Sequence, residues 1–281
     1  MVLLGAHESV VGGIHLAFDR IVEVGGDALQ IFTRNQRQWN PATVTENEQQ
    51  LFSAAWKLHP NMPIASHASY LINLASAKPE LVQKSITAFV DELQRCEMLN
   101  IPLVVMHPGS HGGDGVKAGL SRFIKNLDEA FSQADNQVML LLENTAGQGT
   151  GLGSQFEELA AIIEGSQHSD RLGVCIDTCH TFAAGYDIRT KKTYQATMEE
   201  FDRVVGINRI LFFHLNDSRK GLGSRVDRHE HIGQGEIGLE AFRNLLNDPR
   251  FAKHPMTLET PKGKDLQEDR DNLAALRSLL R

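Results

Sequence analysis

Eight short apolar runs, separated by longer amphipathic stretches, constrain the fold more than any other feature of this sequence. Segments such as LVVMH, VMLLLE and ILFFH are apolar almost throughout, which is the pattern of parallel strands buried on both faces. The runs are Leu3–His7, Ala28–Thr33, Pro63–His67, Pro102–His107, Val138–Glu143, Leu172–Asp177, Arg209–His214 and Pro255–Glu259.

The stretches between the runs have helical periodicity. Between Pro79 and Asn100, apolar residues recur at the spacing of one helix face. Ser154 begins a Ser-x-x-Glu pattern that predicts a capping box, and Gly165 is the predicted end of that helix. Eight strand–helix units with short connections predict an α/β fold, a closed (β/α)8 TIM barrel that forms one domain over residues 1–281. An open doubly wound sheet is the alternative.

Length and cysteine content agree with one barrel in a reducing compartment. The 281 residues slightly exceed the ~250 of a typical barrel. There are only three cysteines, a small and uneven number that argues against a disulfide framework. The first residues lack the basic and apolar regions of a signal peptide, and no apolar run approaches the ~20 residues that cross a bilayer. Nothing suggests an obligate subunit interface. We therefore expect a cytoplasmic monomer without membrane association.

Most of the apolar runs end in a side chain that commonly binds metal ions. The C-terminal ends of barrel strands meet on one face, where active sites are built, so these side chains are expected to converge there. One His or Asp at a strand end is usually a solvated turn residue, but repetition at nearly every strand argues against chance. The residues are His7, His67, His107, Glu143, Asp177, His214 and Glu259.

Two further spacings add candidate metal ligands. His180 follows Asp177 by three residues, and Asp227 and His229 lie two residues apart in the long loop after the seventh run. In an extended segment, side chains two residues apart point the same way. Imidazole and carboxylate donors without a required thiolate suit zinc and also permit manganese or iron, and we interpret Cys179 as a packing residue. Zinc is favoured because it is redox-inert and activates water near neutral pH.

Two loops contain residues suited to a nucleic-acid partner. After the second run, Arg34 and Arg37 stand among side-chain amides and a tryptophan, a composition suited to phosphate and base contacts. After the third run, Tyr70 and Leu71 form an aromatic–aliphatic pair able to wedge into a base stack. Ordinary packing at the barrel top is the alternative for both loops.

The net charge of −7 argues at first against such a partner. Three divalent cations would add +6, taking −7 to −1 and concentrating positive charge in one cleft. The segment Gly233–Gly238 matches the dinucleotide-binding pattern G-x-G-x-x-G. It follows a polar loop instead of a strand, so we interpret it as a loop.

Eight motifs in these regions closely resemble the endonuclease IV family, the second family of apurinic/apyrimidinic (AP) endonucleases. The motifs are FTRNQRQW, HASYLINL, HPGSH, LENTAGQG, GVCIDTCHTFAAGYD, HLNDS, GSRVDRHEHIGQG and LETP, and they run from Gly5 to about Glu259. The resemblance implies a zinc-dependent enzyme that hydrolyses the phosphodiester 5′ to an abasic site in double-stranded DNA. The implied products are a 3′-hydroxyl and a 5′-deoxyribose phosphate, and groups that block 3′ ends are also removed.

The resemblance further implies three zinc ions per chain, with manganese or iron permitted at one position, and Glu143 as the catalytic, bridging residue. The implied ligand sets are His67, His107 and Glu143; Glu143, Asp177, His214 and Glu259; and His180, Asp227 and His229. Three further residues are implied to enter the DNA at the lesion and stabilise a flipped-out abasic nucleotide, namely Arg37, Tyr70 and Leu71.

Two positions depart from the family pattern. Ala68 follows His67 where an acidic residue can occur, and Glu8 follows His7 where a small apolar residue is common. Neither is an expected ligand, so the departures bear on DNA contacts and not on the reaction. No role is assigned from the sequence to His7, His111 or His231.

Two other functions remain open at this point. A sugar isomerase or epimerase uses a similar barrel with one or two divalent ions, about four protein ligands and a closed pocket, whereas nine ligands and an Arg/Gln/Trp loop favour an extended anionic substrate. A protein that binds damaged DNA without cutting it is the non-enzymatic alternative, and a complete ligand set argues against it.

Overall fold

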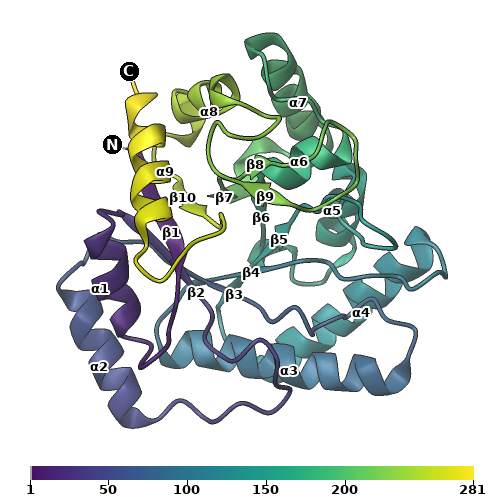
Figure 1. The fold of residues 1–281 in the computed structure, drawn as a ribbon. Coiled ribbons are helices and arrows are strands. Elements are labelled where there is room, and N and C mark those ends of the chain that lie inside the picture. Colours follow the sequence, from purple (N-terminus) through teal and green to yellow (C-terminus); the bar gives the residue numbers. More distant parts are fainter. Residues whose placement is uncertain (1) are drawn as a thin grey trace.

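The computed structural model describes residues 2–281 and contains a closed barrel of eight parallel strands with helices around it (Figure 1). The strands are β1 (Leu3–Glu8), β2 (Ala28–Ile31), β3 (Ile64–His67), β4 (Leu103–Met106), β5 (Met139–Glu143), β6 (Leu172–Asp177), β7 (Ile210–His214) and β10 (Pro255–Leu258). Seven of the predicted runs contain one of these strands, and β1 extends one residue beyond its run, to Glu8. The first strand pairs with the last, so the barrel closes and the open-sheet alternative is wrong.

The helices follow the strands along the chain. They are α1 (Leu16–Glu23), α2 (Glu46–Lys57), α3 (Pro79–Met98), α4 (Val116–Ala134), α5 (Phe156–Gly165), α6 (Thr178–Ala184), α7 (Lys191–Val204), α8 (Leu239–Leu246) and α9 (Gln267–Ser278). Within residues 2–281 there are also three short 3-10 helices, Ser169–Arg171, Ile207–Arg209 and Pro249–Phe251. Among residues 2–281, no helix combines the length and apolar character needed to cross a bilayer.

The predicted helix from Pro79 is α3, but the predicted capping box is wrong. Helix α5 begins at Phe156, and its N-cap residue makes no side-chain capping hydrogen bond. The carboxylate of Glu158 instead accepts hydrogen bonds from the backbone N–H groups of Gly153 and Ser154. The helix ends at Gly165 as expected.

Side chains of the barrel strands alternate between the helix layer and the barrel interior. A small apolar cluster fills the interior and consists of Ala65, Val105, Leu141, Cys175 and Phe212. Positions two residues further along have the same orientation, and on these strands they are His67, His107, Glu143, Asp177 and His214. The apolar cluster therefore lies directly beneath the polar residues at the barrel mouth.

The long loop after β7 contains a two-stranded antiparallel ribbon, β8 (Asp217–Ser218) and β9 (His229–Glu230), and folds around a buried carboxylate. Asp217 accepts hydrogen bonds from the backbone N–H groups of Ser218, Gly233, Ile237 and Gly238. A Cβ at Gly235 would lie only 2.5 Å from Oδ1 of Asp217, so this approach requires glycine. The G-x-G-x-x-G segment thus surrounds an internal carboxylate, which confirms its interpretation as a loop.

Candidate metal centre

Four groups of potential ligand side chains meet at the C-terminal mouth of the barrel. Within each group the ligand atoms lie within 4.8 Å of one another. The groups are His67, His107 and Glu143; Glu143, Asp177, His214 and Glu259; His180, Asp227 and His229; and Asp177, Cys179 and His229. The first three are the sets that the family resemblance implies, and all nine residues are thus brought together.

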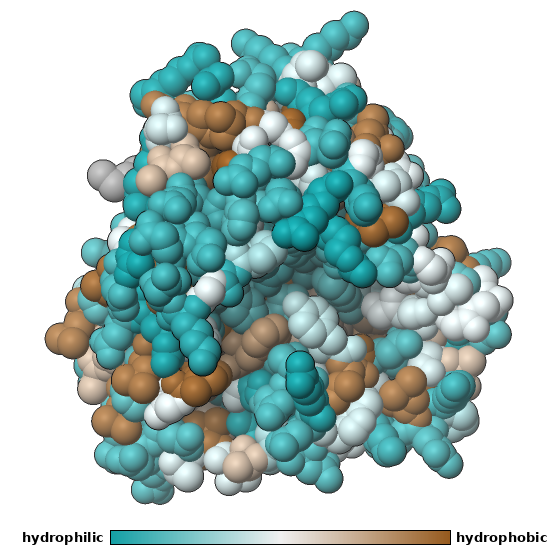
Figure 2. Space-filling model, viewed as in Figure 1, coloured by the Kyte–Doolittle hydropathy of each residue, from teal (hydrophilic) through white to brown (hydrophobic). Residues whose placement is uncertain are grey.

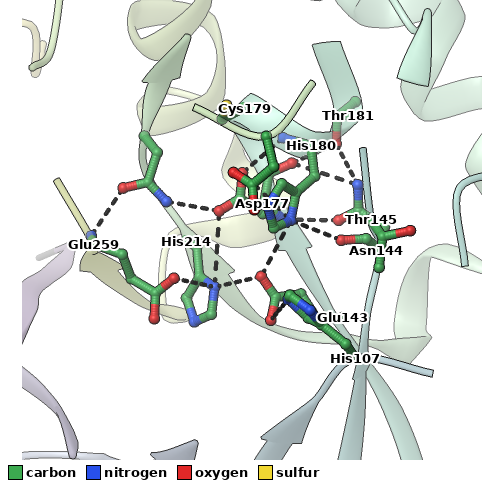
Figure 3. A network of polar contacts seen from close by, with 12 residues as sticks. His107, Glu143, Asn144, Thr145, Asp177, Cys179, His180, Thr181, His214 and Glu259 are labelled. Atoms are coloured by element: carbon green, nitrogen blue, oxygen red, sulfur yellow. Dashed lines mark hydrogen bonds and ion pairs between the residues drawn. The ribbon is translucent and has the colours of Figure 1, made fainter. Parts of the chain in front are cut away.

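Glu143, at the end of β5, is fully buried at the centre of these groups (Figure 3). Its Oε2 lies 3.1 Å from Nε2 of His67 and 3.0 Å from Nε2 of His107. Its Oε1 lies 3.0 Å from Nδ1 of His214 and 3.3 Å from Nδ1 of His180. Burial alone would raise the pKa of Glu143, but His107 and His214 outweigh it and hold the pKa well below its usual range. The two oxygens of one carboxylate therefore face different histidines.

Hydrogen bonds on the outer side of two imidazoles determine which nitrogen faces Asp227. Nδ1 of His180 lies 2.9 Å from the carbonyl oxygen of Asn144, and Nδ1 of His229 lies 3.0 Å from that of Glu259. A carbonyl oxygen only accepts, so both Nδ1 atoms carry the hydrogen and a neutral ring keeps a lone pair on Nε2. Both Nε2 atoms lie 3.3 Å from a carboxylate oxygen of Asp227.

His67 and His214 follow the same rule. Nδ1 of His67 lies 2.8 Å from the carbonyl oxygen of Ala68, which leaves Nε2 for Glu143. Nε2 of His214 lies 2.8 Å from the side-chain oxygen of Gln30, which leaves Nδ1 for the cluster. Such outer contacts are how proteins orient histidine ligands toward metal ions.

These separations fit a cation between the donors. Two ligands at about 2.0–2.1 Å from a tetrahedral zinc lie ~3.3 Å apart, and the shortest N–O separations in the three sets are 3.0 Å, 3.0 Å and 3.3 Å. Nε2 of His229 is buried and makes no hydrogen bond within residues 2–281. Burial alone would lower the pKa of His180, but Asp177, Asp227 and Glu143 outweigh it and raise the pKa well above 6.5, so without a metal a proton lies between this ring and a carboxylate. A metal ion binds the neutral ring and would take the place of such protons, so the imidazole and carboxylate donors fit divalent metal ions.

The fourth group adds Cys179, whose thiol donates to the carbonyl oxygen of Arg228 at 3.7 Å. Burial raises the pKa of this thiol to about 12. A metal binds the thiolate and not the thiol, so the hydrogen-bonded thiol agrees with the interpretation of Cys179 as a packing residue.

Amide side chains that the sequence did not reveal hold the carboxylates in place. Asn216 donates from Nδ2 to Oδ2 of Asp177 at 2.6 Å and accepts from the backbone N–H of Glu259 at 2.8 Å. Asn144 accepts from the backbone N–H of Asp177 at 2.7 Å. Both amides follow a strand-end ligand by one or two residues, and this position is the signal that could have found them. Gln30, within β2, has no such signal.

The three histidines without a predicted role lie outside the ligand groups. Nδ1 of His7 lies 3.0 Å from Oε1 of Glu259, so His7 contacts one of the candidate ligands. His111 accepts from two backbone N–H groups of its own loop. Nδ1 of His231 lies 3.1 Å from the side chain of Asn272.

Beside the ligand groups lies a cavity of about 400 Å³, lined among others by His67, Tyr70, His107 and Asp227. The space-filling view shows a hollow in this face, surrounded mainly by hydrophilic side chains (Figure 2). Tyr70 is 60% exposed, and the centroid of its ring lies 5.2 Å from that of His67 and 5.9 Å from that of His107. Tyr70 therefore stands over the ligand groups, while Leu71 beside it is half-buried.

The loop after β2 contacts this rim, but only one of its arginines is exposed. Gln36 accepts from the backbone N–H of Tyr70, and the neighbouring Arg37 is exposed. Arg34, expected on the rim, is buried: its guanidinium donates to Asp91 at 3.0 Å and to the carbonyl oxygens of Gln38 and Trp39. The expectation for Arg34 is wrong, because this side chain connects the loop to α3 through its hydrogen bond to Asp91.

Two comparisons with known proteins show the class of fold to which this chain belongs. The family model described as "Xylose isomerase-like TIM barrel" matches residues 18–279. A D-tagatose 3-epimerase-like protein aligns with a TM-score of 0.74 over 99% of this chain and 98% of its own, but at 20% identity this likeness shows the fold alone.

Other matches are much more specific. The probable endonuclease 4 of Chloroflexus aggregans is 55% identical, covering 99% of this chain and 97% of that protein. The crystal structure of endonuclease IV from Thermus thermophilus aligns with a TM-score of 0.88 at 37% identity, covering 99% of this chain and 98% of that one. The chain belongs to the endonuclease IV family.

Proposed function

We propose that this protein is a DNA-repair AP endonuclease that hydrolyses the phosphodiester 5′ to an abasic site in double-stranded DNA. The products are a 3′-hydroxyl and a 5′-deoxyribose phosphate, and the same site removes groups that block 3′ ends. The observation that carries the proposal is the buried carboxylate of Glu143, whose two oxygens face separate groups of histidines. Full-length similarity to proteins named endonuclease 4 supports it.

The cofactor in this proposal is zinc, three ions per chain. The first ion would be held by His67, His107 and Glu143; the second by Glu143, Asp177, His214 and Glu259; the third by His180, Asp227 and His229. Manganese or iron is compatible with the same donors at one position. When bound, zinc supplies a nucleophile at neutral pH and offsets the negative charge of the phosphate.

The chain's own residues place the DNA. An abasic nucleotide lacks a base, so extruding it from the duplex costs less unstacking energy than flipping a paired base. Tyr70 is exposed above the ligand groups, where its ring and Leu71 would fill the gap left in the base stack. Arg37, exposed on the neighbouring loop, would pair with a backbone phosphate.

A sugar epimerase is not favoured by any feature of the site. Such an enzyme needs about four ligands in a closed pocket, whereas three ligand groups share this barrel mouth beside an exposed tyrosine. Four sugar epimerases or epimerase-like proteins that align with this chain are 12–20% identical to it, so their likeness shows the fold alone.

The test is a direct assay of the zinc-loaded protein on a duplex oligonucleotide with one abasic site, with an intact duplex and a ketose as parallel substrates. We expect one cut, on the 5′ side of the lesion, leaving an end that a DNA polymerase extends. Turnover of the ketose would overturn the proposal. Abasic DNA that remains uncleaved by protein with its full metal content would overturn it as well. We also propose a monomer with one catalytic domain in the cytoplasm, and size-exclusion chromatography tests the monomer.

A further inference from the structure

The side chain of Gln30 reaches from β2 across the barrel interior to two of the proposed metal ligands. Its Nε2 lies 2.6 Å from Oε1 of Glu259, and its Oε1 lies 2.8 Å from Nε2 of His214. Gln30 is fully buried and pairs in register with His7 of β1. Strand β7, which carries His214, is three strands away around the barrel, so this contact spans the interior.

The chemistry of these groups determines the direction of both hydrogen bonds. A carboxylate only accepts, so the NH₂ end of the Gln30 amide must face Glu259. The amide oxygen is thereby directed toward His214, and since it too only accepts, Nε2 of His214 must carry the hydrogen. In the neutral ring, which is the form that binds a metal ion, the lone pair of His214 would then lie on Nδ1, 3.0 Å from Oε1 of Glu143.

The same amide also determines which oxygen of Glu259 is available. Oε1 of Glu259 lies within hydrogen-bonding distance of Gln30 Nε2 and, at 3.0 Å, of Nδ1 of His7. Oε2 faces Nδ1 of His214 at 3.4 Å. One oxygen is thus held by the protein, and the other is directed toward the lone pair of His214.

We infer that Gln30 is a positioning residue for the ion proposed between Glu143, Asp177, His214 and Glu259. It holds His214 in the Nε2–H tautomer and leaves Oε2 of Glu259 as the ligand oxygen. This inference rests on the proposed metal-dependent function and extends it to a strand that contributes no ligand. Outer contacts of this kind change metal affinity by about 10- to 100-fold when they are removed.

The first test replaces Gln30 with methionine, which has nearly the same length and volume but cannot hydrogen-bond through an amide. Zinc-loaded Gln30→Met and wild-type proteins are titrated with a chelator, and retained zinc is measured by elemental analysis. We expect one ion to be lost at about 10- to 100-fold lower chelator strength in the variant. The matched control is Asn136→Leu, which removes a buried, hydrogen-bonded amide just before β5, at the opposite end of the barrel, and should retain zinc as the wild type does.

The second test uses the wild-type protein as well, so it does not depend on the variant folding. In zinc-loaded protein with ¹⁵N-labelled histidine, the Nε2 hydrogen of His214 should be visible by NMR and exchange slowly, and Gln30→Met should speed that exchange. A wild-type His214 with its hydrogen on Nδ1, or a variant with unchanged zinc retention and exchange, overturns the inference. A wild-type protein that binds no zinc instead contradicts the proposed function.

Discussion

Oε1 of Glu143 and Nδ1 of His214 lie 3.0 Å apart at the barrel mouth, and neither side chain is exposed to solvent. They come from β5 and β7, on either side of β6. Because the other nitrogen of His214 donates to an amide oxygen, a neutral His214 presents a lone pair to a carboxylate. A proton or a metal ion between the two atoms resolves this repulsion, and the central claim of the proposed function is that Glu143 shares metal ions with its neighbours.

The bridging role of Glu143 predicts that Glu143→Gln loses cleavage but keeps DNA binding. The amide preserves the shape of the side chain but removes the charge that both adjoining ions need, so we expect at least a 100-fold fall in cleavage rate, on the order of a strong metal-site defect. Abasic-oligonucleotide cleavage and fluorescence anisotropy on the same duplex measure the two properties. Full activity in this variant would contradict the bridging role.

Metal removal should lower stability as well as activity, because an ion that binds the folded state and not the unfolded state stabilises the folded state. Each ion bound at ~1,000 times its dissociation constant contributes about 4 kcal/mol, so chelation should lower Tm by roughly 5 °C or more. Calorimetry before and after chelation, followed by zinc addition, measures the effect and its reversal. A Tm that does not respond to chelation would show that no ion stabilises the barrel mouth.

The exposed ring of Tyr70 is expected to determine the preference for abasic over intact duplex. Loss of a stacked aromatic ring costs about 1–3 kcal/mol, so Tyr70→Ala should reduce this preference by about tenfold or more in competition binding. Tyr70→Phe keeps the ring and is the matched control. An unchanged preference in Tyr70→Ala would contradict the proposal that the Tyr70 ring fills the gap in the base stack.

The barrel and the candidate ligands at strand ends were predictable from sequence because both depend on one regular pattern, whereas the division of the ligands into three groups came from the family resemblance. A strand buried on both faces is apolar throughout, and its last inward position is the only place for a polar ligand, as in Glu143 after LLL. Neutral amide side chains that contact the ligands do not follow this pattern. Gln30 lies inside β2, and its contacts with Glu259 and His214 arise only when the barrel closes.

Loop geometry was predicted less well than strand position. Arg34 and Arg37 have the same chemistry and neighbouring positions, yet one is buried against Asp91 and the other is exposed. This difference depends on α3, whose Asp91 lies more than fifty residues further along the chain. The capping box failed similarly, because Glu158 competes for the backbone N–H groups at the start of α5.

Glu8 is one of the positions that depart from the family pattern, and its buried carboxyl group leads to a prediction about how stability depends on pH. Burial raises its pKa from 4.5 to about 7; Lys262, with Nζ 3.5 Å away, opposes the rise, and Asp269 adds to it. The folded state therefore binds a proton that the unfolded state releases, so the contribution of Glu8 to stability falls as pH rises from about 4.5 to about 7.

Glu8→Gln should therefore stabilise the metal-loaded protein at pH 8 by on the order of 1–3 kcal/mol and flatten the dependence below pH 7. Urea unfolding at several pH values measures both effects. The exposed Glu164→Gln, which removes the same charge from α5, should leave the profile unchanged. Equal or lower stability of Glu8→Gln at pH 8 would contradict the assignment.

The most direct test of the central claim is anomalous diffraction at the zinc edge from crystals of the zinc-loaded protein. Three peaks are predicted at the barrel mouth, two of them about 2.0–2.2 Å from opposite oxygens of Glu143. Peaks that all lie beyond the reach of Glu143, or a single ion bound without it, would contradict the account.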